Sequence, residues 1–171
     1  MKTYELIMVS SEISFLIFES FFKESIRVKL NWERLINENV TVGLSVLDEL
    51  ENPSAWYLPW YFNDIDEEVS YLVTNASPLT LADIPKAINR LHSKRIDKIK
   101  ELLSGFINTT KQPVQVVIAT YALPNGKHLI IDANHRSSAL IIAGVRARLM
   151  VFEVLGSLDQ ELLPDLCHWK D

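Results

Sequence analysis

The sequence predicts an α+β protein whose mixed sheet is flanked by helices. Residues 113–122 alternate and are rich in β-branched side chains, and the turn signal Pro124-Asn125-Gly126 separates them from a second apolar run, so a hairpin is expected. Apolar side chains recur every three to four residues over 87–104, which predicts an amphipathic helix. A chain with both signals combines strands and helices around one core.

Length and composition fit a globular protein. The 171 residues, 48% hydrophobic and 23% charged, are enough for one ordinary core. No apolar run reaches the roughly 18 to 20 residues of a membrane span. The first ten residues lack the basic and small-residue features of a signal peptide, and the single cysteine, Cys167, excludes an internal disulfide. We therefore expect a cytoplasmic protein that does not enter a membrane.

The first 78 residues form an acidic, aromatic-containing elaboration with α/β character. Residues 3–9 predict a buried strand. For residues 12–30 two interpretations stay open: a helix capped by Ser11 with phenylalanines at helical spacing, or strands, which the β-rich composition favours. A short helix is expected over 31–37, capped by Asn31.

The next stretch is dominated by prolines and aromatic side chains. Residues 51–66 contain Pro53, Pro59 and five aromatics, which indicates an irregular, partly exposed segment. Residues 68–74 then predict a strand that ends at the turn-forming sequence 75–78.

Signals are sharper over residues 79–156. A short extended segment, 79–84, precedes the helix 87–104, which should end near Gly105. The hairpin comes next, followed by a short helix over 137–143 that stops at Gly144 and a strand over 148–155. Residues 157–171 complete the chain, and the sequence Ser-Leu-Asp-Gln at 157–160 predicts a capping box for a final helix.

Charge is distributed unevenly along the chain. Residues 1–79 carry 5 Lys/Arg against 13 Asp/Glu, residues 80–156 carry 11 against 5, and residues 157–171 carry 1 against 4. The basic middle suits an anionic ligand. The acidic first part argues against wrapping a nucleic-acid duplex, so DNA is not an expected partner.

The basic middle contains a pentapeptide, Asp132-Ala133-Asn134-His135-Arg136, between an apolar strand and a helix; we call residues 132–136 the junction. Unsatisfied N–H groups and a partial positive charge at a helix start favour phosphate binding. Arg136 can hold phosphate in two-point geometry. Asp132 is either a helix cap or a ligand for metal or ribose, and His135 is either a buried imidazole or a group that contacts phosphate and transfers protons. Asn134 fits local turn chemistry.

The order of elements and the sequence around the junction resemble the ParB/sulfiredoxin superfamily. The likeness covers residues 79–156 and rests on Ile131-Asp-Ala-Asn-His-Arg-Ser-Ser-Ala-Leu140, followed by Ala143-Gly144-Val145. It implies a ParB/sulfiredoxin-like mixed sheet that binds a nucleotide (ATP, ADP or CTP, with Mg²⁺) or another phosphate ester, with phosphotransfer or nuclease chemistry. On this resemblance the catalytic candidates are Asp132 and His135, and the ligand contacts are Asn134, His135, Arg136, Ser137, Arg90 and Arg95.

The chain also departs from the family pattern. Asn134 stands where sulfiredoxins carry a reactive cysteine, so their reduction chemistry is not expected. Only 15 residues follow residue 156, too few for the helix-turn-helix region of chromosome-partition proteins. Ala133 replaces the usual glycine, which argues against a positive φ there and against a very close phosphate approach.

A second functional class is a non-catalytic binding protein. The segment Trp56–Glu68 combines aromatic side chains with Asp64, Asp66 and Glu67, a pattern suited to a basic partner if the aromatics are exposed, and to the core if they are not. Small acidic proteins of this character include immunity proteins that neutralise bacterial nuclease toxins. The basic helix face, with Arg90, Lys94 and Lys98, is either a solvated surface or part of the anion site.

Overall fold

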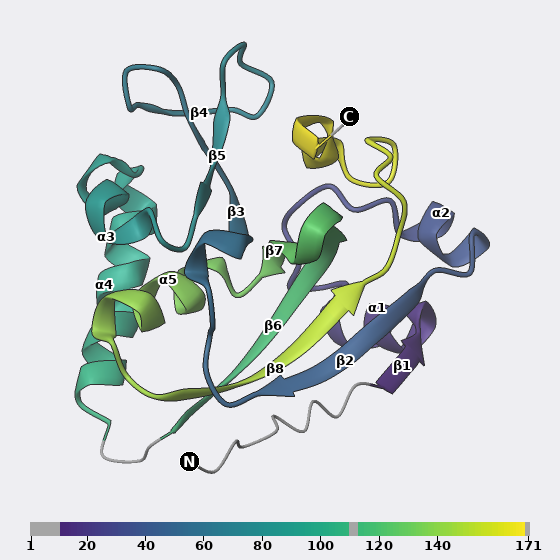
Figure 1. The fold of residues 1–171 in the computed structure, drawn as a ribbon, viewed down its shortest axis with the longest axis horizontal. Coiled ribbons are helices and arrows are strands. Elements are labelled where there is room, and N and C mark those ends of the chain that lie inside the picture. Colours follow the sequence, from purple (N-terminus) through teal and green to yellow (C-terminus); the bar gives the residue numbers. More distant parts are fainter. Residues whose placement is uncertain (1–10, 110–112, 170–171) are drawn as a thin grey trace.

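The computed structural model describes residues 11–109 and 113–169, which build a mixed α+β fold around one eight-stranded sheet (Figure 1). The strand order is β1-β2-β8-β6-β7-β3-β4, and β5 pairs with β3. The strands are β1 Ser11–Ser14, β2 Thr41–Leu47, β3 Trp56–Phe62, β4 Glu68–Val69, β5 Ser77–Thr80, β6 Val114–Leu123, β7 Lys127–Asp132 and β8 Ala147–Val154. The α-helices are α1 Phe15–Phe22, α2 Trp32–Asn37, α3 Ile84–Ala87, α4 Ser93–Ile107 and α5 Asn134–Ala143.

The predicted hairpin is confirmed. Strands β6 and β7 pair antiparallel from Leu123↔Lys127 to Ala119↔Asp132, and Asn125 and Gly126 adopt the positive φ values that such a turn requires. After α5 the chain returns as β8, which pairs parallel with β6 on its other edge. Strand β8 also pairs antiparallel with β2, so this late strand lies inside the sheet.

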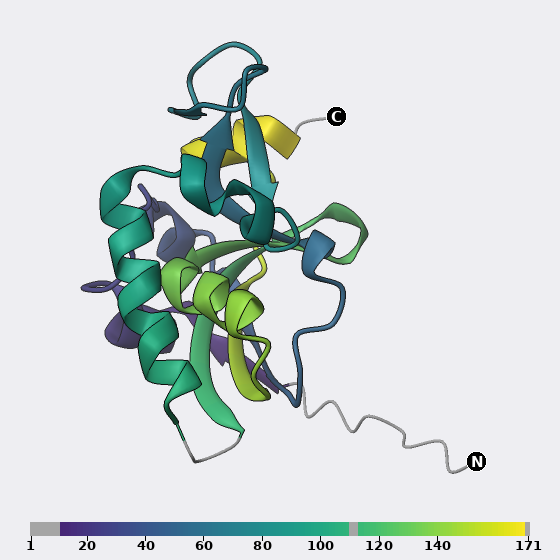
Figure 2. The ribbon, with the colours of Figure 1, turned by 90° about the vertical axis from the view of Figure 1, so that its left-hand side faces the viewer.

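Each face of the sheet carries its own apolar core. Helices α4 and α5 lie together on one face, where Ile99 and Leu140 pack against Ile118 and Ile130 (Figure 2). The opposite face is covered by α1, α2 and the 3₁₀ helix Pro164–Trp169, and there Phe18 packs among Phe152 and other buried side chains. Successive strand residues point to opposite faces, so the three apolar residues of β7 supply both cores, Ile130 on one face and Leu129 and Ile131 on the other.

The open question over residues 12–30 is resolved as a short strand followed by a helix. Strand β1 precedes α1, whose N-cap residue is Ser14 and not Ser11, and Ser14 makes no side-chain cap hydrogen bond. The predicted α2 is confirmed, since the Asn31 side chain accepts a hydrogen bond from the Arg34 N–H at 3.1 Å. The strand expected over 3–9 lies outside the described residues.

The irregular segment expected over 51–66 is wrong for most of its length. It contains β3, where Trp56, Trp60, Tyr61 and Phe62 are buried. Pro59 is tolerated because it falls where the β3–β5 register shifts and beyond the two residues that β3 pairs with β7. Aromatic side chains that looked like surface anchors therefore belong to the core.

Three further expectations are corrected. The strand over 68–74 shrinks to β4. Residues 63–76, which we call the arm, connect β3 to β5 and extend beyond the end of β3, where only β4 pairs with the sheet (Figures 1 and 2). The helix over 87–104 is interrupted before Ser93, because the Glu68 carboxylate accepts the His92 N–H at 2.6 Å and fixes the start of α4 there. The final helix is replaced by turns and a 3₁₀ helix, since the Asp159 carboxylate accepts the nearby Glu161 N–H.

The sheet is continuous across residue 78, the boundary expected between the elaboration and the core segment. Strand β5 spans that position, and β3 pairs with both β5 and β7. Within residues 11–109 and 113–169, no helix has the length and apolar character needed to cross a membrane.

Candidate functional site

The junction is built by a sharp turn from β7 into α5. The helix starts at Asn134, three residues earlier than expected, so His135 and Arg136 belong to its first turn. The first intrahelical bond runs from the Ser137 N–H to the Ala133 carbonyl at 2.8 Å. The N–H groups of residues 134–136 thus have no partner in the preceding turn and are available to a ligand.

Ala133 is the N-cap residue and adopts a left-handed conformation, with φ +72° and ψ 22°. The expectation that alanine would prevent a positive φ here is wrong. The interpretation of Asp132 as the cap is also wrong, because its carboxylate instead accepts from the Ser25 hydroxyl at 3.4 Å and lies 3.5 Å from the Arg136 guanidinium. A left-handed alanine costs about 1 kcal/mol, and such strain is concentrated at functional sites.

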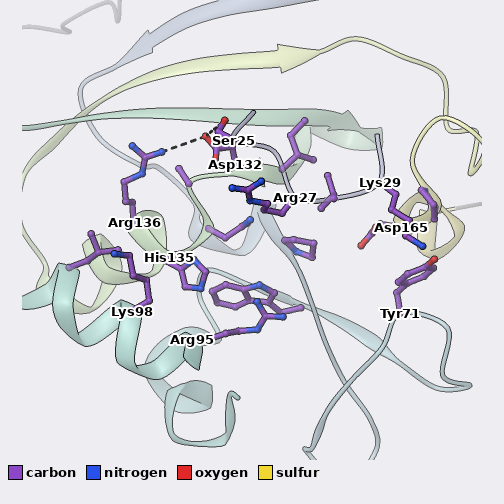
Figure 3. A pocket seen from close by; sticks show the side chains of 18 residues that line it. Ser25, Arg27, Lys29, Tyr71, Arg95, Lys98, Asp132, His135, Arg136 and Asp165 are labelled. Atoms are coloured by element: carbon purple, nitrogen blue, oxygen red, sulfur yellow. Dashed lines mark hydrogen bonds and ion pairs between the residues drawn. The ribbon is translucent and has the colours of Figure 1, made fainter. Parts of the chain in front are cut away.

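The junction opens into a cavity of about 790 Å³ (Figure 3). Five cationic side chains from three segments line it, against two carboxylates. The cations are Arg27 and Lys29 from the loop before α2, Arg95 and Lys98 from α4, and Arg136 from α5; the carboxylates are Asp132 and Asp165. An excess of positive charge over a helix start makes the cavity attractive to anions.

Arg95 is fixed in the cavity wall by two contacts. Its Nε donates to the Glu68 carboxylate at 2.6 Å, and its guanidinium lies 4.8 Å from the centre of the Trp60 ring. The His135 ring lies 5.2 Å from the same indole. Trp60 therefore orients both a cation and an imidazole next to the junction.

The surroundings of His135 favour the neutral form of its imidazole. Burial lowers the pKa of its imidazole, and the positive charges of Arg95 and Lys98 lower it further. A neutral imidazole at neutral pH can accept a proton, which is the property required of a general base.

The predicted ligand residues separate into two groups. Asn134, His135, Arg136 and Arg95 line the cavity with Asp132. Arg90 does not, because it forms an ion pair with Asp66 on the arm.

Two polar atoms near the junction have no hydrogen-bond partner among the described residues: Oδ1 of Asn134 and Oγ of Ser137. Both atoms are buried, and Ser137 is fully covered and absent from the cavity lining. A buried polar group without a partner is costly, and Asn134, which lines the cavity, can be satisfied by a bound ligand.

Sequence reasoning missed Arg27 and Lys29. A signal for them was present, since residues 23–29 contain three of the five Lys/Arg of the first 79 residues. The acidic net charge of that region concealed this local basic cluster, which only the fold brings to the junction.

In residues 11–109 and 113–169, no group of three or more His, Cys, Asp or Glu side chains is placed to hold a metal ion. The neighbours Cys167 and His168 are part of the C-terminal packing: His168 Nε2 lies 3.0 Å from the Tyr71 carbonyl, and its ring stacks on Tyr61.

No family model, curated protein or solved structure matches this chain. The functional interpretation therefore depends on the geometry and charge of the cavity.

Proposed function

We propose that the protein binds a nucleotide or another phosphate ester at the junction, within a ParB/sulfiredoxin-like fold. One observation carries the proposal: the first turn of α5, with its free N–H groups, faces a cavity lined by five cationic side chains. Arg136 would take two phosphate oxygens, while Arg95 and Lys98 would neutralise the remaining charge.

The same residues define what chemistry the site would support. Neutral His135 would accept the proton of an attacking hydroxyl or water during phosphoryl transfer or phosphodiester cleavage. Asp132 would contribute a single carboxylate to Mg²⁺ brought by the nucleotide, an ion commonly held by one or two carboxylates together with phosphate oxygens. Both roles depend on ligand binding.

Isothermal titration with ATP, ADP and CTP, with and without Mg²⁺, tests the proposal. Arg136→Ala should weaken binding at least tenfold, since a charge-assisted phosphate contact contributes about 1.5 to 3 kcal/mol. Lys100→Ala is the matched control, because Lys100 is exposed on α4 and lies outside the cavity. Absence of binding to all three nucleotides in the folded protein would overturn the proposal.

The arm favours a second candidate function, a non-catalytic protein that binds a basic partner such as a nuclease toxin. The aromatic side chains expected to anchor it are mostly buried, but Ile65 and Leu72 are 72% and 76% exposed beside the acidic residues Asp64 and Glu67. Exposed apolar side chains rimmed by charge are typical of protein-binding sites.

The second candidate is tested by mixing the protein with a basic nuclease domain, taken from a neighbouring gene that encodes one. The complex should survive gel filtration, and Asp64→Asn with Glu67→Gln should weaken it, because rim charges mainly set the association rate. Asp83→Asn is the control for charge, since Asp83 is exposed outside the arm. A complex unaffected by the arm substitutions would place the interface elsewhere.

A further inference from the structure

We infer that the cavity takes a nucleotide with two separated phosphate groups, one at the junction and the other at Arg27 and Lys29. This inference rests on the proposed function and specifies its ligand class: a nucleoside bisphosphate whose phosphates occupy different positions of the sugar. Four observations on the cavity support it.

The cations are spread along the cavity. In Figure 3, Arg136 lies toward one end and Lys29 toward the other, near Tyr71 and Asp165, with Arg27 between them. A single phosphate at the first turn of α5 engages the junction and leaves Arg27 and Lys29 without a bound anion. Asp165, also at the far end, already accepts a hydrogen bond from the Tyr61 hydroxyl at 2.5 Å. Cations at both ends therefore fit a ligand with charge at both ends.

The two loop cations are also free to bind. Arg95, Lys98 and Arg136 each have a carboxylate within 4 Å, from Glu68, Glu101 and Asp132. Within residues 11–109 and 113–169, no carboxylate forms an ion pair with Arg27 or Lys29. Two unpaired like charges that share a cavity favour an anion as their partner.

The segment that carries them is held in place. Ile26 and Leu30 are buried on either side of the two cations, and the Asn31 N–H donates to the Leu162 carbonyl at 2.8 Å. Arg27, Val28 and Lys29 all line the cavity, where the backbone bends at Val28 and the Leu30 N–H donates to the Val28 carbonyl at 2.9 Å. Anchored neighbours reduce the ordering cost of binding, because the backbone is already in position.

Apolar surface lies among the charges. Pro59, Trp60, Val28 and Ile131 contribute to the same lining, which suits the sugar and base of a nucleotide better than a continuous polyphosphate chain. The volume of about 790 Å³ lies within the range of about 300 to 1,000 Å³ typical of small-molecule sites.

The experiment compares two probes that differ by one phosphate, adenosine 5′-monophosphate and adenosine 3′,5′-bisphosphate, by calorimetric titration of the full chain. The bisphosphate should bind about tenfold more tightly, from the added charge-assisted contacts. In Arg27→Ala/Lys29→Ala the two affinities should converge to within about twofold, while Arg136→Ala should weaken both ligands. Lys23→Ala, an exposed lysine outside the cavity, should keep the tenfold difference.

The outcomes separate the two proposals. If the monophosphate binds and Arg136→Ala weakens it, but the bisphosphate gains nothing, the second phosphate position is wrong and the proposed function stands. A gain that persists in Arg27→Ala/Lys29→Ala also overturns the second position. Failure of both probes to bind the folded protein would overturn the second phosphate position, whereas the proposed function is overturned only when ATP, ADP and CTP also fail to bind.

Discussion

The junction and the arm both border the cavity, but they are built in opposite ways. The junction starts a helix in which Ser137, Ser138, Ala139 and Leu140 are buried against the sheet. The arm projects into solvent with exposed apolar residues, and it reaches the cavity through Tyr71 and through the Glu68–Arg95 ion pair at its base. The junction is thus the rigid side of the cavity, whereas the exposed tip of the arm, with Ile65 and Leu72, offers a surface that can change with little effect on the core.

The same substitution on the two sides should give the largest difference. Leu140→Ala should destabilise the protein by about 2 to 5 kcal/mol, because it removes a buried side chain between α5 and the sheet. Leu72→Ala on the exposed arm should stay within about 0.5 kcal/mol. Urea unfolding measures both, and equal losses would show that the arm is packed as tightly as the junction.

Glu68 connects the two regions, so its removal tests how far they depend on one another. Glu68→Ala should cost about 1 to 3 kcal/mol of stability, since Arg95 and the His92 N–H lose a charged acceptor. It should also weaken nucleotide binding, because Arg95 loses its anchor. Glu67→Ala, exposed and one residue away, is the matched control. Unchanged nucleotide affinity in Glu68→Ala would make the arm independent of the cavity.

Backbone strain at the junction predicts a smaller gain in stability. Ala133→Gly should raise the free energy of unfolding by about 0.5 to 1 kcal/mol, because glycine adopts φ +72° without steric cost. Ala139→Gly, inside the same helix, should instead lower it by at least about 1 kcal/mol. Chemical denaturation distinguishes the two signs, and a loss in both variants would contradict the strain at residue 133.

The pH dependence of His135 should be the smallest effect. Its pKa is lower in the folded protein than in the unfolded chain, so the unfolded state takes up more protons as pH falls through the ordinary histidine value. This contribution to stability is present above that value and declines as pH drops toward the folded-state pKa. His135→Gln should therefore lose less stability than the wild type between pH 7.5 and pH 5.5 in urea titrations. If the free energy of unfolding falls equally in wild type and His135→Gln, His135 does not contribute to the pH dependence of stability.

The sequence predicted the parts of the fold that depend on local interactions better than the parts that depend on long-range contacts. The hairpin and the β7–α5–β8 order were recoverable because the Pro124-Asn125-Gly126 turn and the Gly144 stop are local signals. Strand β3 was not, because its pairing with β7 is long-range and the burial of its aromatics depends on the helices that cover them.

The candidate site divides in the same way. The junction and Arg95 could be selected from the pattern around residues 79–156, and the structure places them in one cavity. Arg27 and Lys29 could not, because only tertiary packing brings the loop before α2 to the start of α5. The prediction that Arg90 contacts the ligand was wrong for a similar reason. Its ion-pair partner Asp66 belongs to the arm, which no local sequence pattern indicated.

The position of β8 has a consequence for how the chain folds during synthesis. Strand β2 has β8 as its inner neighbour, and residues 42–47 of β2 pair with residues 149–154. Until those late residues leave the ribosome, β1 and β2 have no route into the main sheet, and β6 lacks one of its two partners. Such distant pairing slows folding and leaves strand edges open in the nascent chain, so we expect β2 to need protection until residues 149–154 have been synthesised.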